Sequence, residues 1–213
     1  MGQNLPSSSL LNPHIHLTRP SNGFRNLVTF AAQTRSKVAN ITSPFKAALN
    51  VKSSKAQALK NTAKLSECRK YRFALWRTWD DSKPYVMFVG LNPSTADETT
   101  DDPTLTRCIN YAKSWGFGGV CMANIFAYRA TEPNDMKAAT DPIGSENNDW
   151  LKKLSNEAGM VVAAWGNDGS YLGRSQQVKD LLPNLHCLKL NKSGEPAHPL
   201  YQKADIEPVP MSI

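Results

Sequence analysis

Four polar segments of the chain could bind a polar ligand, and each follows a run of apolar residues. Each segment contains an asparagine or a histidine, whose side chain can donate or accept hydrogen bonds. The four segments are Gly90–Ser94, Asn124–Arg129, Trp165–Asn167 and Gly194–Tyr201. We expect them to meet at one ligand-binding site.

An acidic stretch lies directly after the first of these segments. Residues 97–102 contain four carboxylates in six positions and precede Pro103. Asp101 or Asp102 could cap a helix that begins at Pro103 and complement its dipole. Asp97, Asp101 and Asp102 could instead bind Mg²⁺, which prefers hard oxygen ligands, or one of them could act as a general base. The spacing alone leaves these three interpretations open.

The apolar runs predict the strands that would bring the polar segments together. Short runs without alternation are typical of strands that are covered on both faces. We predict helices at 103–115, 136–139, 145–158 and 174–182 between or after them. The apolar runs span 85–89, 119–127, 160–165 and 185–190. This order predicts a three-layer α/β/α sandwich with a mainly parallel central sheet of about four strands. Because parallel strands share one carboxyl edge, we expect the polar segments to meet there.

The charges divide the chain into a basic extension, residues 1–66, and a domain, residues 67–213. The first 66 residues contain nine Lys or Arg and no acidic residue, whereas the remainder contains sixteen basic and eighteen acidic residues. We predict that the extension is mostly disordered, with short helices possible at 24–32 and 56–65. It has the composition of an organellar transit peptide or of a nonspecific nucleic-acid-binding arm, or it could be an extension with no role. In the domain, alternating residues 68–79 predict an edge strand with one exposed face.

The remaining bulk features exclude several classes of protein. No run of 18 apolar residues exists, so no membrane span is expected. The chain has no Walker lysine and no G-x-G-x-x-G sequence. Its four cysteines form no Cys-x-x-Cys pair, and we expect Cys121 and Cys187, which lie among apolar residues, to be buried thiols rather than zinc ligands or disulfides. We predict a cytoplasmic location unless the extension directs the protein to an organelle.

Three of the polar segments resemble short motifs of the uracil-DNA glycosylase superfamily. Gly90-Leu91-Asn92-Pro93-Ser94 looks like the first-strand sequence Gly-x-Asn-Pro-Gly, with serine in place of the last glycine. Asn124 is similar to an asparagine that ends a second strand. His198-Pro199-Leu200 matches the first two positions of a late His-Pro-Ser sequence. The order of the motifs agrees over residues 85–201, while the acidic stretch is foreign to the pattern.

This resemblance implies a glycosylase-like α/β fold and assigns roles to the polar residues. Asn92 would orient a hydrolytic water, and His198 would stabilise negative charge on a departing base. Asn124 would bind the edge of the base, while Phe126 or Tyr128 would stack on it. No cofactor is implied. The full set of expected substrate-binding residues is Gly90, Pro93, Ser94, Asn124, Phe126, Tyr128, Arg129, Gly166, Asn167 and Leu200.

Structural interpretations of the same residues stay open. Asn92 could cap its turn through the backbone, and His198 could be a surface loop residue. Arg129 and Arg107 could hold a phosphate, because a planar guanidinium suits that geometry, or they could pair with local carboxylates. We expect Trp165 to pack beneath the end of the sheet.

The domain is also similar, and more specifically, to an uncharacterised family of bacterial and mobile-element proteins, domain of unknown function 1643. This resemblance runs from about residue 68 to residue 210 and brings no established activity. The segments that carry it are 91–97, 102–104, 115–119, 124–127, 163–166 and 198–201.

Together these observations support three hypotheses for the domain. The leading one is a nucleobase-recognising hydrolase of N-glycosidic bonds that acts on DNA or on a nucleotide or nucleoside. A second is a non-enzymatic, nucleic-acid-associated binding protein of a mobile element. The third is a metal-dependent nucleotide-processing enzyme that uses the carboxylates of residues 97–102. The domain is almost neutral, although duplex DNA binding relies on lysine and arginine at phosphates, so small nucleotides stay among the expected substrates.

Overall fold

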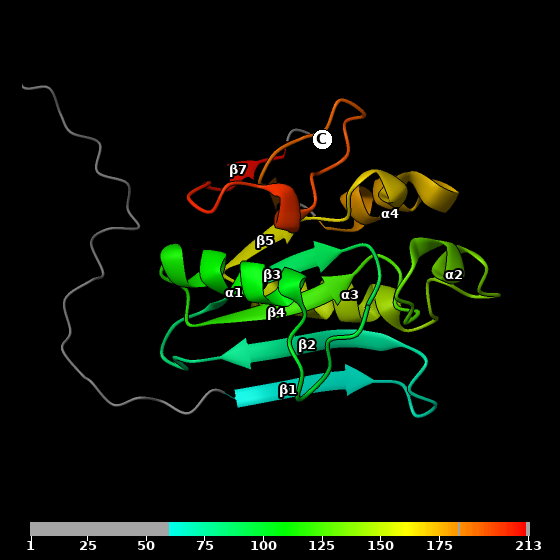
Figure 1. The fold of residues 1–213 in the computed structure, drawn as a ribbon, viewed down its shortest axis with the longest axis horizontal. Helices are drawn as coiled ribbons and strands as arrows, with labels where there is room; N and C mark the ends of the chain where they lie inside the picture. Colours follow the sequence, from blue (N-terminus) through cyan, green and yellow to red (C-terminus); the bar gives the residue numbers. More distant parts are fainter. Residues whose placement is uncertain (1–59, 183, 212–213) are drawn as a thin grey trace, which may run out of the picture. The chain divides into compact units, whose positions relative to one another are not determined.

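The computed structural model describes residues 60–182 and 184–211, which form one mixed sheet with helices on both faces (Figure 1). The strands are β1 (Lys60–Leu65), β2 (Arg72–Thr78), β3 (Tyr85–Gly90), β4 (Gly119–Asn124), β5 (Met160–Ala163), β6 (His186–Cys187) and β7 (Val209–Pro210). The helices are α1 (Pro103–Ser114), α2 (Pro133–Lys137), α3 (Asn147–Glu157) and α4 (Arg174–Leu181). There are also two 3₁₀ segments. η2 (Asn167–Gly173) lies between β5 and α4, and η3 (Pro199–Tyr201) lies between β6 and β7.

The sheet has seven strands in the order β1-β2-β4-β3-β5-β6-β7. β3 pairs in parallel with β4 and with β5, and β5 pairs in parallel with β6. The pairs β1–β2, β2–β4 and β6–β7 are antiparallel. The prediction of about four mainly parallel strands is therefore corrected to a mixed sheet of seven. β2 was predicted, as an edge strand, whereas β1 and β7 were missed because β1 is mostly polar and β7 has only two residues.

Two predictions about the first strands were wrong. A short helix was considered possible at residues 56–65, but Lys60–Leu65 form β1 and pair along β2. Local helix propensity of lysine and alanine is weak compared with the backbone hydrogen bonds that the open side of β2 offers. Consequently β2 is an interior strand, not an edge strand, and its Arg72 and Arg77 are buried. The predicted helix at 24–32 lies outside the described residues.

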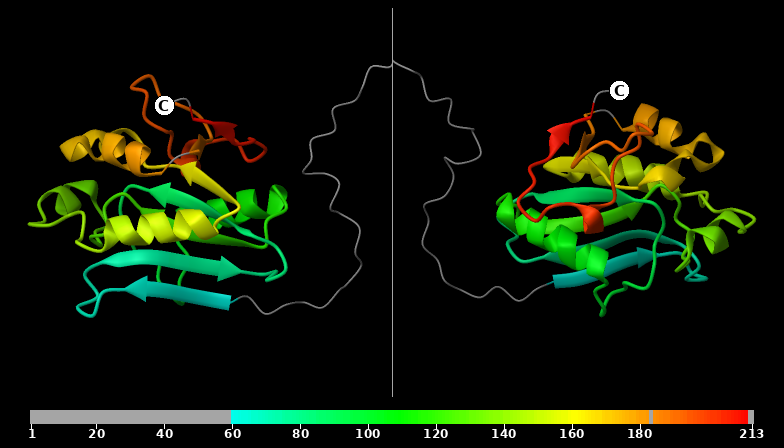
Figure 2. Two further views of the ribbon diagram at one scale, coloured as in Figure 1. Left: turned by 180° about the vertical axis from the view of Figure 1, so that it is seen from behind. Right: turned by 45° about the horizontal axis from the view of Figure 1, so that its top comes forward.

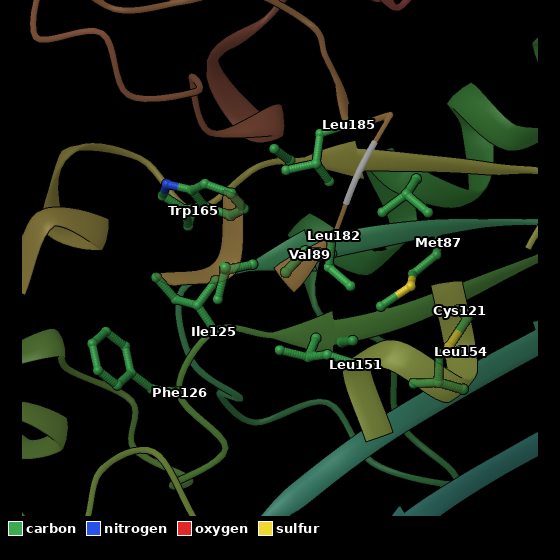
Figure 3. Close-up of a cluster of buried hydrophobic side chains, with 14 of the residues drawn as sticks. Met87, Val89, Cys121, Ile125, Phe126, Leu151, Leu154, Trp165, Leu182 and Leu185 are labelled. Atoms are coloured by element: carbon green, nitrogen blue, oxygen red, sulfur yellow. The ribbon is translucent and has the colours of Figure 1, made fainter. Parts of the chain in front are cut away.

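Each face of the sheet is covered by helices, as the two turned views show (Figure 2). α1 packs on one face, where Leu105 and Ile109 meet Phe88 and Val120. α3 and α4 pack on the opposite face, where Leu151 and other apolar side chains meet the alternate residues of β3 and β4 (Figure 3). Both faces of the central strands are thus apolar, as their unbroken hydrophobic runs predicted.

Helix α1 forms where its sequence signals place it. The Asp102 side chain caps it, because its Oδ1 accepts a 2.7 Å hydrogen bond from the backbone N–H of Leu105. Pro103 follows at the first helical position, where its missing N–H costs nothing. Beyond the last turn, Gly116 has φ +83°, a conformation that favours glycine. The predicted helix at 103–115 is confirmed to within one residue.

The order of the strands creates a crevice between β3 and β5. The connection from β3 through α1 leads to β4 on one side, whereas the connection from β5 through α4 leads to β6 on the other. The two loops therefore leave the sheet in opposite directions, on opposite faces, as right-handed crossovers require. Such a reversal opens a space beyond the carboxyl ends of adjacent strands, where α/β proteins bind ligands.

Within the described residues, no helix is both long and apolar enough to cross a membrane.

Candidate functional site

A cavity of about 640 Å³ opens at the carboxyl ends of β3, β4 and β5. Its lining comes from the loops after these strands and from residues 197–202, which lie across the top of the crevice. The structure places seven of the expected site residues in this lining: Gly90, Asn92, Ser94, Asn124, Gly166, Asn167 and His198. The polar segments after the three strands therefore share one cavity with His198.

Asn92 has one half of its amide occupied and the other half accessible. Its Nδ2 donates to the carbonyl of Ala130 at 2.7 Å and to that of Pro93 at 3.1 Å. Its Oδ1 has no partner among the described residues and is not buried. The turn-capping interpretation thus accounts for the amide nitrogen, which ties the loop after β3 to residue 130. The oxygen is left as a fixed hydrogen-bond acceptor in the cavity lining.

Asn124 shows the opposite arrangement. It is 4% exposed, and its Oδ1 accepts a hydrogen bond from Arg72 Nη2 at 3.2 Å. Its Nδ2 has no partner within the described part of the chain but stays accessible in the cavity lining. A Cβ on Gly90 would lie 2.9 Å from this nitrogen, so the glycine leaves room for the amide. Asn124 therefore presents a donor where Asn92 presents an acceptor.

His198 is a neutral imidazole with its proton on Nε2. Its Nδ1 accepts a hydrogen bond from the backbone N–H of Leu200 at 3.4 Å, so Nδ1 carries no proton. Burial lowers the pKa of His198, and the charge of Asp102 opposes this shift only in part. The neutral ring must then hold its proton at Nε2. His198 thus adds a second donor to the cavity.

A buried polar network holds the segment that carries His198. Glu195 is almost fully buried, and its carboxylate accepts hydrogen bonds from Trp165 Nε1 and Ser175 Oγ, each at 2.7 Å. Lys179 Nζ lies 3.9 Å from the same carboxylate. The backbone N–H of Gly166 also donates to the carbonyl of Pro196 at 2.9 Å. The histidine segment is thereby fixed to the end of β5 and to α4.

The carboxylates of the acidic stretch are used to hold the loop. Asp101 accepts a 2.8 Å hydrogen bond from the buried Arg77, whose Nη2 also donates to the carbonyl of Asp97. The Asp97 side chain accepts the backbone N–H groups of Thr99 and Thr100, which lower its pKa. Asp102 caps α1, as one interpretation predicted, but it also lines the cavity.

The three carboxylates do not come together as metal ligands. Among residues 60–182 and 184–211, no group of three His, Cys, Asp or Glu side chains is arranged to hold a metal ion. Asp97 folds back on its own turn, Asp101 faces Arg77 and Asp102 faces the first turn of α1. The acidic stretch is therefore held by local hydrogen bonds and by Arg77 of β2, and Asp102 alone of its residues lines the cavity.

With the geometry established, comparisons with known proteins identify the family. A family model described as a protein of unknown function (DUF1643) matches residues 72–200. The chain belongs to this family. A search of curated proteins and a search of solved structures each returned no match. The DUF1643 description assigns no activity, so the glycosylase resemblance rests on its short motifs alone.

The region matched by the DUF1643 model contains nearly the whole cavity. It begins at Arg72, the first residue of β2, and ends at Leu200. Asn92, Asn124 and His198 all lie inside it. The two outer parts of the sheet, β1 and β7, lie beyond the matched region.

Five of the expected binding residues lie outside the cavity lining of this DUF1643 domain. Phe126 is fully buried in the core and packs against the ring of Tyr171, at 5.9 Å between centroids. Tyr128 packs edge-on against Tyr71. The other three are Pro93, Arg129 and Leu200. The placement of Phe126 and Tyr128 does not suit stacking on a ligand in this cavity, because the strand ends at Asn124 and the chain turns into the core.

The remaining three residues have identifiable surroundings. Pro93 is buried, and its carbonyl accepts the backbone N–H of Ala130 at 3.0 Å. Arg129 Nη1 donates to the carbonyl of Arg69 at 3.3 Å. Leu200 lines a shallower hollow beside the first turn of α1.

Asn167, Gly166 and Asp168 form the β5 side of the cavity. Asn167 Oδ1 accepts hydrogen bonds from Asn191 Nδ2 at 2.9 Å and from Ser193 Oγ at 2.8 Å. Gly166 has φ +72°, which turns the chain out of the sheet. Asp168 pairs with Lys137 at 2.6 Å. Asn167 thus serves mainly to hold the loop that leads to His198.

Sequence reasoning missed two residues of the site. Arg72 lines the cavity although it is 4% exposed. Tyr201 also lines the cavity, is 81% exposed, and lies beside the His198 ring with centroids 5.6 Å apart. The sequence signal for Arg72 was misinterpreted as the wet face of an edge strand. Tyr201 ends the last of the four polar segments, so its position was available but its aromatic ring was not singled out.

Proposed function

We propose that this domain recognises a nucleobase in its cavity and hydrolyses an N-glycosidic bond, in DNA or in a nucleotide or nucleoside. The observation that carries the proposal is the set of accessible polar atoms on Asn92, Asn124 and His198. One acceptor and two donors line a single cavity. The other polar atom of each of the three side chains is held by a hydrogen bond within the protein. The crevice beyond the ends of β3 and β5, in a sheet with helices on both faces, also suits a glycosylase-like α/β/α sandwich.

Asn92 supplies the acceptor for the hydrolytic water. A water that donates to Oδ1 has its lone pair free to attack carbon, which is the orientation that hydrolysis needs. The anchored Nδ2 keeps the amide from turning, because a flip would place its oxygen against the carbonyl of Ala130. The side chain is thus preorganised before a substrate binds.

His198 and Asn124 supply donors for the departing base. A base that leaves as an anion carries negative charge on its ring oxygens or nitrogens, and fixed N–H groups stabilise that charge. Neutral His198 can donate from Nε2 throughout the neutral pH range, since burial lowers its pKa. Exposed Tyr201 replaces Phe126 and Tyr128 as the aromatic platform for the base.

In the proposed step, the C1′–N bond breaks and its electron pair stays on the base. The oxygen of the water held by Asn92 forms the new bond to C1′. The proton that this water loses passes to the carboxylate of Asp102, which lines the same cavity, and returns to the base through solvent. One N-glycoside and one water are therefore converted to a sugar with a free hydroxyl at C1′ and a base that carries the proton.

The test is the release of free base, measured by liquid chromatography and mass spectrometry. The full-length protein is incubated with uracil-containing and modified-base oligonucleotides, and separately with nucleotides and nucleosides. We expect base release that falls about 100-fold or more in Asn92→Ala, the scale seen when one preorganised polar group is removed. Asn156→Ala on the exposed side of α3 is the matched control and should retain activity.

The outcomes separate the three hypotheses. Specific binding without any base release would favour the non-enzymatic binding protein. Processing that needs Mg²⁺ and is lost in Asp101→Ala would favour the metal-dependent enzyme. Equal activity in Asn92→Ala and Asn156→Ala would exclude the role proposed for Asn92.

A further inference from the structure

Arg72 is a buried cation at the inner wall of the cavity. It is 4% exposed, and burial lowers its pKa to about 10, with the charge of Asp102 acting in the opposite direction. Arg72 therefore stays charged at neutral pH. Among the ion pairs of the described residues, none includes this guanidinium. A buried charge without a paired carboxylate is uncommon and invites a functional explanation.

The hydrogen bonds of Arg72 point to Asn124. Its Nη1 donates to the carbonyl of Ala96 at 2.6 Å, and its Nη2 donates to Asn124 Oδ1 at 3.2 Å. Its Nε is buried and has no partner in the described part of the chain. Arginine has donors and no acceptors, so the atom of Asn124 that faces it must be oxygen. The amide orientation of Asn124 is thereby settled by chemistry.

The backbone around Asn124 is held as firmly as its side chain. Asn147, which is fully buried, donates from Nδ2 to the carbonyls of Asn124 and Ile125, each at 3.0 Å. Arg174 Nε donates to the Ile125 carbonyl at 2.9 Å. Movement of the backbone cannot easily compensate for a flipped amide. Only the NH₂ group of Asn124 is left for a ligand.

We propose that Arg72 is a positioning residue that makes Asn124 a donor only, so that this end of the cavity accepts an oxo group and rejects an exocyclic amine. This inference deepens the proposed function, on which it rests, by naming the class of base. An amide that is free to flip can serve either partner, whereas a flip here would point NH₂ at the guanidinium. Two donors would then face each other, and the buried hydrogen bond would be lost.

The charge of Arg72 also acts through the amide. A hydrogen bond from a cation to Oδ1 polarises the amide and strengthens its N–H groups as donors. The oxygen of an oxo base becomes more negative as the base leaves with the bond electrons. Arg72 thus favours the departing anion without touching it, and Asn124 makes the contact.

The test compares pairs of nucleosides that differ in one oxo or amino group: uridine with cytidine, and inosine with adenosine. Dissociation constants for the full-length protein are measured by titration calorimetry, so that no catalysis is needed. We expect the oxo member of each pair to bind about tenfold tighter or more, the scale of one hydrogen bond to a charged or fixed partner. Arg72→Met should reduce this ratio to about one, whereas Arg72→Lys, which is also a pure donor, should restore much of it.

Two further variants keep the test decisive. Arg77→Met removes the other buried arginine of β2, which also holds the 97–102 loop but does not contact Asn124, so it should retain the preference. Gly90→Ala pushes a methyl against Asn124 Nδ2 and leaves Arg72 in place. It should weaken the oxo member selectively, even if Arg72→Met fails to fold.

The results separate this inference from the proposed hydrolysis. Oxo-selective binding that depends on Arg72, without base release, would support the inference and exclude hydrolysis. Base release with a preference that Arg72→Met and Gly90→Ala leave unchanged would overturn the inference alone. A wild-type preference for the amino member, or no binding of any of the four nucleosides, would also overturn it.

Discussion

Two polar regions meet at the cavity, and they use their hydrogen-bonding groups differently. In the acidic loop, residues 97–102, the four carboxylates are occupied by Arg77, by Arg69, by the turn itself and by the first turn of α1. At the strand ends, Asn92 and Asn124 each use one amide atom for the structure and leave the other accessible. The acidic loop is richer in charge, yet the strand ends have the hydrogen-bonding atoms that are free to bind a ligand.

The difference shows why charge density in a sequence is a poor guide to a site. A carboxylate next to a helix start or beneath a buried arginine has local partners that the fold supplies. An amide that is anchored at one atom is held in a defined orientation and can still bind a ligand with the other. We therefore propose that the loop is structural and that the strand ends carry the chemistry, with Asp102 as the residue that belongs to both.

The largest expected effect on stability comes from Arg77→Met. Arg77 is fully buried and pairs with Asp101, whose side chain is about one-third exposed. Removing one member of a buried pair costs about 3 kcal/mol, at the lower end of the usual range because water can reach Asp101. Urea unfolding measures the loss. If the loop is only structural, the folded variant should bind nucleosides as the wild type does. A changed specificity would show that the acidic loop takes part in ligand binding.

A smaller effect is expected at Asp102, and it sharpens the division between the regions. Asp102→Ala removes the cap of α1 and should lower the free energy of unfolding by about 1 kcal/mol. Asp102→Asn keeps a capping oxygen, so its stability should be close to that of the wild type. Urea unfolding and base release are measured on both variants. Retained base release in Asp102→Asn would show that Asp102 is a cap and nothing more.

The smallest effect is the pH dependence that His198 adds to stability. Burial lowers its pKa in the folded protein, so the unfolded chain binds more protons once the pH falls below the ordinary histidine value of about 6.5. The free energy of unfolding should therefore decrease as the pH falls through that value. Protonation at Nδ1 would also break the hydrogen bond from Leu200.

The measurement compares wild type with His198→Asn, which retains an acceptor near Leu200 but does not titrate. Urea unfolding at about pH 7.5 and at about pH 5.5 should show a larger acid-induced loss for the wild type than for the variant. The other titratable groups are common to both proteins, so their contributions cancel in the difference. Equal losses would mean that His198 is as accessible in the folded state as in the unfolded chain.

The central part of the fold was predictable because its signals are local. The unbroken apolar runs of β3 and β4 indicate burial on both faces, and Asp102, Pro103 and Gly116 mark the ends of α1. The outer strands were not predictable in the same way. β1 is mostly polar, and its pairing depends on the open side of β2. β7 has only two residues and is defined by its antiparallel pairing with β6, which lies within the predicted strand at 185–190 and pairs in parallel with β5.

The site was predictable to the extent that it follows from strand ends. Asn92, Asn124 and His198 come together because parallel strands share a carboxyl edge and the chain returns across it. Arg72 could not be assigned, because its burial depends on a loop twenty-four residues further along the chain, whose Ala96 carbonyl it binds. Phe126 was misplaced for a similar reason, since two residues after a strand end the chain had already entered the core.

The measurement that tests the account most directly is an NMR titration of the uniformly ¹⁵N-labelled protein with uridine and inosine. The side-chain NH₂ signals of asparagine are separate from the backbone signals, and those of Asn124 report its accessible donor. We predict that the Asn124 NH₂ signals shift on binding, while those of Asn156 and the backbone signals of residues 97–101 stay in place. Saturable shifts confined to the acidic loop, or no shift at Asn124 with either nucleoside, would contradict the assignment of ligand binding to the strand ends.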